Sequence, residues 1–136
     1  MALEVKVFVL FAMIFLHIVD DYYLQGILAS MKQKDWWPKQ FPPNAMPKMY
    51  KNDYKAALIA HAFSWSFMIH LPAIICYFAF SPHTFFFIMW VFLLIGQALI
   101  HAVVDNAKAN THVVNLCQDQ AMHLAQMLLS WAILIL

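Results

Sequence analysis

The chain is poor in glycine and in charge, and it contains no arginine. Of its 136 residues, two are glycine and 11% are charged, whereas 64% are hydrophobic. This composition lies well outside the soluble average and is typical of membrane proteins. All eight basic residues are lysines, and they form no patch interleaved with the stacking aromatics that nucleic-acid readers use. The sequence therefore indicates a membrane protein and no nucleic-acid partner.

Common catalytic motifs are missing as well. The sequence has no Gly-rich phosphate loop, no nucleophile elbow and no dinucleotide fingerprint. Its two cysteines, Cys76 and Cys117, form no CxxC pair, so zinc-ribbon and dithiol redox chemistry have no support. We therefore look for chemistry among the other polar residues.

Long apolar runs predict the architecture. Each run can be extended to the roughly 20 residues that a membrane-spanning helix needs. We predict an all-α, integral membrane four-helix bundle that forms a single transmembrane domain over residues 1–136. The predicted helices cover approximately residues 3–25, 56–80, 84–106 and 113–136. The connection 26–55 mixes Trp, Pro and Lys, a pattern typical of a segment at the lipid headgroup level.

The lysines predict the orientation. Six of the eight lie in the connection 26–55 or at its end, and Lys108 lies between the third and fourth predicted helices. By the positive-inside tendency both connections face the cytoplasm. Both termini and the short turn at 81–83 are then expected on the non-cytoplasmic side.

Ionisable side chains gather at the predicted cytoplasmic ends of the four helices. One charged group at a helix centre in hydrocarbon costs about 2.5–3.5 kcal/mol or more, so such groups need partners or a function. In the predicted topology all of them fall at a similar depth. The cluster consists of His17, Asp21, His61, His101, Asp105, Asp119 and His123.

This cluster has the chemistry of a metal site. Residues four apart share one helix face, so three His/Asp pairs each present two ligands in one direction. Imidazole with carboxylate suits Zn²⁺, Mn²⁺, Fe²⁺ or Ni²⁺. Seven ligands are more than one tetrahedral zinc ion needs, and they suit a site with two ions. Zinc and manganese are the favoured metals. A hydrogen-bond network without metal and a proton-relay or transport site remain open alternatives.

Further polar residues continue the same faces. Gln25 and Gln97 lie one turn from the cluster, where they could orient a ligand or bind substrate. Lys108 could meet a phosphate oxygen as a point charge, or extend to the interface for topology alone. Asp20 and Asp119 are the candidates for general acid or base.

The motifs resemble those of a known family. The chain carries H-x3-D-x2-L-Q from His17, a His on the second predicted helix, H-x3-D-x2-K from His101 and D-Q-x2-H from Asp119. This order is similar to an uncharacterised family of small four-helix membrane proteins of bacteria and phages, which more distantly resembles predicted membrane-bound metal-dependent hydrolases. The resemblance implies metal ligation at all seven cluster residues and a multi-pass place in the bacterial inner (cytoplasmic) membrane.

These features together predict a function. We expect a metal-dependent hydrolase that acts at the cytoplasmic interface on an amphipathic or phosphate-containing substrate, such as a lipid headgroup. One alternative is a non-enzymatic phage or bacterial membrane protein that engages a host partner or modifies the envelope. Another is a metal or proton carrier. A homo-oligomer remains open, since no small-xxx-small stripe marks a packing face.

Overall fold

The computed structural model describes residues 1–80 and 84–136. Within these ranges it contains α-helices, short 3₁₀ and π segments, and no strand, which confirms the all-α prediction. The turn expected at 81–83 lies outside the described residues. The α-helices are α1 Leu3–Ile18, α2 Leu28–Met31, α3 Asp53–Phe80, α4 Thr84–Ala109 and α5 Leu116–Ile135. The other segments are η1 Val19–Leu24, a π-helix, and the 3₁₀-helices η2 Lys34–Gln40 and η3 Lys48–Asn52.

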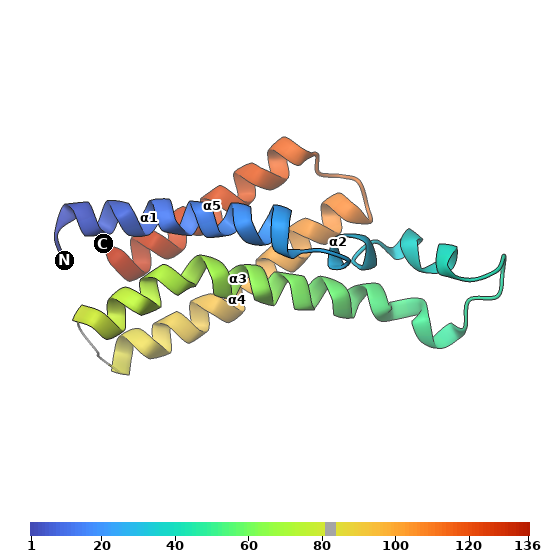
Figure 1. The fold of residues 1–136 in the computed structure, drawn as a ribbon, viewed down its shortest axis with the longest axis horizontal. Coiled ribbons are helices and arrows are strands. Elements are labelled where there is room, and N and C mark those ends of the chain that lie inside the picture. The colour runs from blue at the N-terminus through green and yellow to red at the C-terminus, as the bar shows by residue number, and fades with distance from the viewer. Residues whose placement is uncertain (81–83) are drawn as a thin grey trace.

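The four long helices run alternately in opposite directions (Figure 1). Helix α3 packs most extensively on α4, while α1 packs on both α3 and α5. The two termini meet at one end, where the Lys6 ammonium donates to the Leu136 carbonyl at 3.3 Å. The opposite end therefore gathers the last turns of α1 and α4 and the first turns of α3 and α5.

Two helical stretches are long and apolar enough to cross a membrane. They are Lys48–Phe80, which adds η3 to α3, and Phe85–Ala109, which is nearly all of α4. Helix α1 has 16 residues and continues into η1. The outer faces carry exposed phenylalanines, with Phe8 and Phe92 each 70% exposed.

The helix boundaries differ from the predicted ones for local reasons. The first helix stops being α-helical at Ile18 and widens into the π-helix η1, a feature that single-sequence periodicity does not show. The last helix begins at Leu116 because Asn115 and Gln118 form a reciprocal capping box, which stops the helix from starting at the predicted residue 113.

The interior is divided into an apolar half and a polar half. Near the termini the core consists of aliphatic and sulfur-containing side chains around Trp65. At the other end buried His, Asp, Gln and Lys side chains gather, beside a few buried apolar residues such as Leu58 and Val104. Trp65 is fully buried where the two halves meet.

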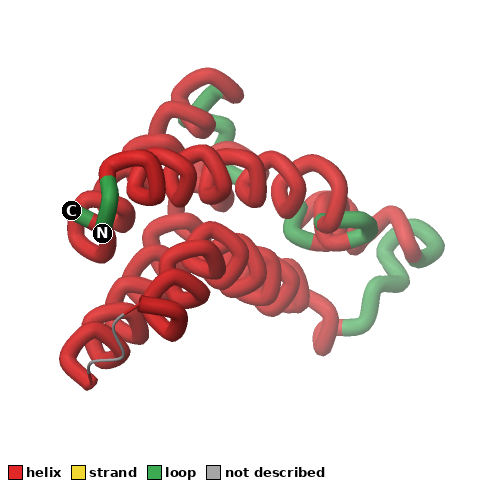
Figure 2. The backbone as a smooth tube through the Cα atoms, turned by 60° about the vertical axis from the view of Figure 1, so that its left-hand side comes forward, coloured by secondary structure: helices red, strands yellow, loops and turns green. Residues whose placement is uncertain are grey.

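The connection between η1 and α3 folds back onto the end of α4. Asn110 donates to the Lys32 carbonyl at 3.0 Å and accepts from the Lys34 backbone N–H at 2.7 Å. Figure 2 shows this connection as loops and short helical turns beyond the long helices. Because both bonds hold the backbone, the Lys32 side chain is directed into the polar half.

Candidate metal centre

Six of the seven predicted ligands meet in three overlapping groups. Within each group one nitrogen or carboxylate oxygen per residue lies within 4.8 Å of the others. The groups are Asp21 with His61 and His101, His101 with Asp105 and His123, and Asp21 with Asp119 and His123. Their members come from η1, α3, α4 and α5, so the antiparallel packing assembles the cluster.

His61 lies at the centre of one side of the cluster. Its Nε2 is 3.3 Å from Asp21 Oδ1 and 3.4 Å from Asp105 Oδ2. The Nε2 atoms of His61 and His101 face each other at 3.2 Å. Two imidazole nitrogens and two carboxylates thus converge on one small volume.

His123 and Asp119 form the other side. His123 Nε2 lies 3.4 Å from Asp119 Oδ1 and 3.8 Å from Asp105 Oδ1. Both His123 and Asp119 are fully buried, and neither of these two facing atoms has a hydrogen-bond partner within the described part of the chain. A buried polar atom without a partner is costly, and a divalent cation would satisfy His123 Nε2. The residues present therefore fit a metal ion.

His17 takes a different place from the other predicted ligands. The Trp65 indole N–H donates to His17 Nδ1 at 2.7 Å, so His17 Nε2 carries the proton and donates to Gln120 Oε1 at 3.0 Å. Both ring nitrogens are thereby engaged, and none of the three ligand groups found among the described residues includes His17.

Gln120 links this histidine to the cluster. Its amide nitrogen donates to Asp21 Oδ2 and to Asp119 Oδ2, each at 3.1 Å. The chain of contacts from Trp65 through His17 and Gln120 thus fixes the orientation of two candidate ligands, which is how residues around a metal tune its site.

Asp20 lies behind His61 rather than at the centre of the cluster. It is 1% exposed, its Oδ1 accepts from the Ser64 hydroxyl at 2.7 Å, and its Oδ2 is 3.8 Å from His61 Nδ1. A carboxylate on this nitrogen orients the ring so that Nε2 faces the cluster. The arrangement suits a positioning role.

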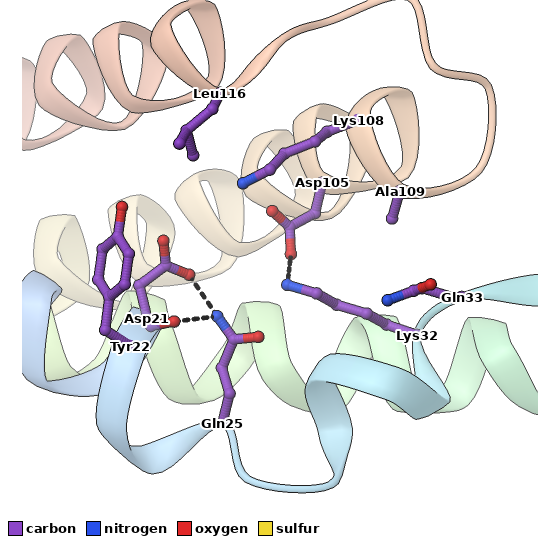
Figure 3. A pocket seen from close by; sticks show the side chains of 9 residues that line it. All are labelled: Asp21, Tyr22, Gln25, Lys32, Gln33, Asp105, Lys108, Ala109 and Leu116. Carbon is purple, nitrogen blue, oxygen red and sulfur yellow. Dashed lines mark hydrogen bonds and ion pairs between the residues drawn. The ribbon is translucent and has the colours of Figure 1, made fainter. Parts of the chain in front are cut away.

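Two lysines bind the cluster carboxylates. Lys32 Nζ is 2.5 Å from Asp105 Oδ2, and Lys108 Nζ is 2.5 Å from Asp119 Oδ2. Both side chains line a cavity of about 260 Å³ that also exposes the Asp21 carboxylate (Figure 3). The cavity therefore combines candidate metal ligands with two cationic groups.

The two glutamines predicted to belong to the site, Gln25 and Gln97, lie in different places. Gln25 lines the cavity and donates to Asp21 Oδ1 at 2.6 Å. Gln97 lies deeper, where it donates to Ser130 Oγ at 3.0 Å and accepts from Gln126 Nε2 at 2.8 Å. Gln126 Oε1 is in turn 3.5 Å from His123 Nδ1. Gln25 therefore lies at the cavity wall against Asp21, whereas Gln97 is linked to His123 through Gln126.

Sequence reasoning missed Lys32, Trp65 and the roles of two glutamines. Trp65 follows His61 by four residues and Gln126 follows His123 by three, so helical spacing could have found both. Gln120 stands in the D-Q-x2-H motif. Nothing in the sequence separates Lys32 from the other lysines of the connection.

Fold and site together define an all-α helical protein with two candidate membrane helices and buried His/Asp groups that could hold a metal ion. No protein-family model, curated protein or solved structure matches this chain. The family resemblance of its motifs stays a prediction.

Proposed function

We propose that this chain is a membrane-embedded, metal-dependent hydrolase of amphipathic phosphate esters. The observation that carries the proposal is the cavity of Figure 3, where Asp21 and Asp105 face Lys32 and Lys108. Carboxylates with imidazoles hold divalent cations, and ammonium groups beside them attract an anion. Phosphoryl hydrolysis is the chemistry that uses both.

In this proposal four helices cross the membrane, namely α1 and α5 in addition to the two candidate spans. Helices α1 and α5 pack in the same bundle, and their exposed side chains include Phe11 at 66% and Leu129 at 52%. Large apolar side chains on the outside of a bundle are suited to lipid. With the lysine-rich connection in the cytoplasm, the site lies at the cytoplasmic interface and both termini lie on the other side.

Divalent ions held by the cluster would polarise the phosphoryl oxygens and supply water of lowered pKa. Lys32 and Lys108 bind the phosphate oxygens and place phosphorus over the cluster. Hydrolysis adds hydroxide to phosphorus, breaks the ester P–O bond and puts a proton on the departing oxygen. We assign the proton to Asp119, because two of the ligand groups could hold the metal ions without it. Its Oδ1 has no hydrogen-bond partner among the described residues, while its Oδ2 is held by Lys108 and Gln120. It accepts the proton from water and returns it to the departing alcohol.

The cavity rim favours an amphipathic substrate. Tyr22 and Leu116 line the cavity and are each 56% exposed. An apolar tail could lie across them while the phosphate reaches the lysines. A substrate with both parts would enter from the interface, where lipids present their headgroups.

The carrier alternative has weaker support. Buried polar contacts continue from His123 through Gln126 and Gln97 to Ser130. Beyond that depth the fully buried side chains include His70, whose Nδ1 lies 2.8 Å from the Ser66 carbonyl of its own helix. His70 Nε2 has no hydrogen-bond partner among the described residues, so the hydrogen-bonded path does not continue through it.

The test is hydrolysis by protein purified without chelator. Zinc- or manganese-loaded chain in zwitterionic nanodiscs is given short-chain phosphatidic acid, short-chain phosphatidylglycerol and an aryl phosphate, and products are measured by mass spectrometry. We expect hydrolysis that disappears in His101→Ala and Asp105→Asn but remains in Asp35→Asn, whose carboxylate is exposed outside the cluster. Equal turnover in all four proteins would overturn the proposal.

A further inference from the structure

The charge of the buried cluster is unbalanced as it stands. Asp20, Asp105 and Asp119 are at most 2% exposed, and the Asp21 side chain is 5% exposed. Among the described residues, the two ammonium groups of Lys32 and Lys108 stand against these four carboxylates, so with neutral imidazoles the formal charge is −2. One divalent cation brings this sum to zero.

A second divalent cation would make the site positive. The formal charge would become +2 in a buried volume where unpaired charge is expensive. The Lys32 side chain is 11% exposed and its backbone is held by Asn110, so this ammonium group has little freedom to withdraw and relieve the charge. Lys108, whose side chain is 34% exposed, is paired with Asp119. The second ion therefore requires an incoming ligand that carries two negative charges.

From this balance we infer that the substrate is a phosphate monoester in its dianionic form, bound between Lys32 and Lys108 together with the second metal ion. The inference rests on the proposed function and names its substrate class. A monoester carries about −1.5 to −2 charge at neutral pH, whereas a phosphodiester keeps one charge. Only the monoester neutralises the two-ion site.

The geometry agrees with this arrangement. Both ammonium groups lie on the wall of one cavity, beside the carboxylates of Asp21 and Asp105 (Figure 3). A phosphate in that cavity would meet both lysines as point charges and the metal ligands behind them. The terminal phosphate of a lipid and that of a soluble ester share this chemistry.

The second metal ion and the phosphate monoester should therefore bind cooperatively. If the dianion is the counter-charge of the second ion, each must raise the affinity of the other by the same factor. Coupling between two sites is typically about 5- to 150-fold. A diester carries one charge and leaves the two-ion site at +1, so it should raise the second ion's affinity less than a monoester does.

The experiment measures Mn²⁺ binding, not turnover. The 136-residue chain, treated with chelator and placed in phosphatidylcholine nanodiscs, is titrated with Mn²⁺. Free Mn²⁺ is read by electron paramagnetic resonance. Separate arms contain glycerol 3-phosphate, dihexanoylphosphatidic acid, or their diester counterparts dimethyl phosphate and dihexanoylphosphatidylglycerol. We expect two binding steps, with the second at least about fivefold tighter with a monoester than with its diester. If glycerol 3-phosphate tightens the second step, the substrate is a soluble ester. If only dihexanoylphosphatidic acid does so, the substrate is a lipid.

Lysine variants separate counter-charge from structure. In Lys32→Met and Lys108→Met the site is more negative, so the second Mn²⁺ should bind more tightly without phosphate and the monoester effect should shrink. A merely structural role would weaken Mn²⁺ binding instead. Lys55→Met removes an exposed lysine and should match the wild type.

Two results would overturn the inference about the monoester without overturning the proposed function. They are a second Mn²⁺ step that responds equally to monoester and diester, and a single Mn²⁺ step at every concentration. Phosphate ester hydrolysis by the same preparation would then leave the proposed function standing. If no Mn²⁺ or Zn²⁺ binds at all, both the inference and the proposed function fall.

Discussion

The indole N–H of Trp65 donates a 2.7 Å hydrogen bond to Nδ1 of His17. The same indole stacks on His101 with ring centroids 4.1 Å apart and an interplanar angle of 14°. One tryptophan thus holds a candidate metal ligand by its face and a positioning histidine by its edge. It joins the apolar core to the candidate metal centre.

Substituting Trp65→Phe keeps a stacking ring and removes the N–H. His17 then loses the donor that fixes its tautomer, and Gln120 loses its orientation. We expect metal affinity to fall about 10- to 100-fold, as when a residue around a metal site is changed. Metal titration measures this, with Trp131→Phe as the matched control. Trp131 donates to the Lys6 carbonyl at 2.8 Å, far from the cluster. Equal losses in both variants would argue against a special role for Trp65.

The histidines His17 and His123 should behave differently. His123→Gln removes a nitrogen that two of the ligand groups use, so bound metal should drop by about one ion per chain in a two-ion site. His17→Gln should keep the full metal content at reduced affinity. Elemental analysis of purified variants distinguishes them. Loss of a whole ion in His17→Gln would restore the sequence-based prediction that His17 is a ligand.

Asp20 was a candidate acid or base from sequence, and its location favours positioning. Because its carboxylate faces His61 Nδ1 and Ser64, Asp20→Asn should weaken metal binding about 10- to 100-fold. The turnover number at saturating metal should stay near that of wild type. Parallel measurement of metal affinity and kcat checks this. A large fall in kcat with normal metal affinity would instead assign Asp20 to the reaction.

The cavity rim should matter only for substrates with an apolar tail. Leu116→Gln replaces a rim side chain, and a Leu contact buried by substrate contributes about 1.5 kcal/mol or more. We expect KM for short-chain phosphatidic acid to rise about tenfold, since about 1.4 kcal/mol corresponds to that factor. KM for glycerol 3-phosphate should not change. Leu24→Gln, at a 58% exposed position outside the cavity lining, is the control. A rise for both substrates would count against a tail on this rim.

Much of the fold follows from patterns that a single sequence displays. Long apolar runs make helices, and their polar ends must be brought together when consecutive helices pack antiparallel. That is why His61, His101, Asp105 and His123 could be grouped before any coordinates. The all-α class and the gathering of these residues at one end of the helices needed no further information.

The remaining features depend on tertiary contacts. His17 lies four residues before Asp21, yet the π-helix η1 and the indole of Trp65 give the two side chains different partners. Lys32 reaches Asp105 only because Asn110 holds the connection against α4. Neither bond is encoded by local spacing, so periodicity could not have found them.

Metal content and coordination test the central claim most directly. The chain is purified without chelator, its metals are counted by elemental analysis, and their ligands are identified by X-ray absorption. The account predicts about two divalent transition-metal ions per chain, with nitrogen and oxygen ligands at about 2.0–2.2 Å if the metal is zinc. It predicts their loss in His101→Ala and Asp105→Ala and their retention in Asp35→Asn. A folded wild-type chain that binds no transition metal, even after zinc or manganese is added, would contradict it.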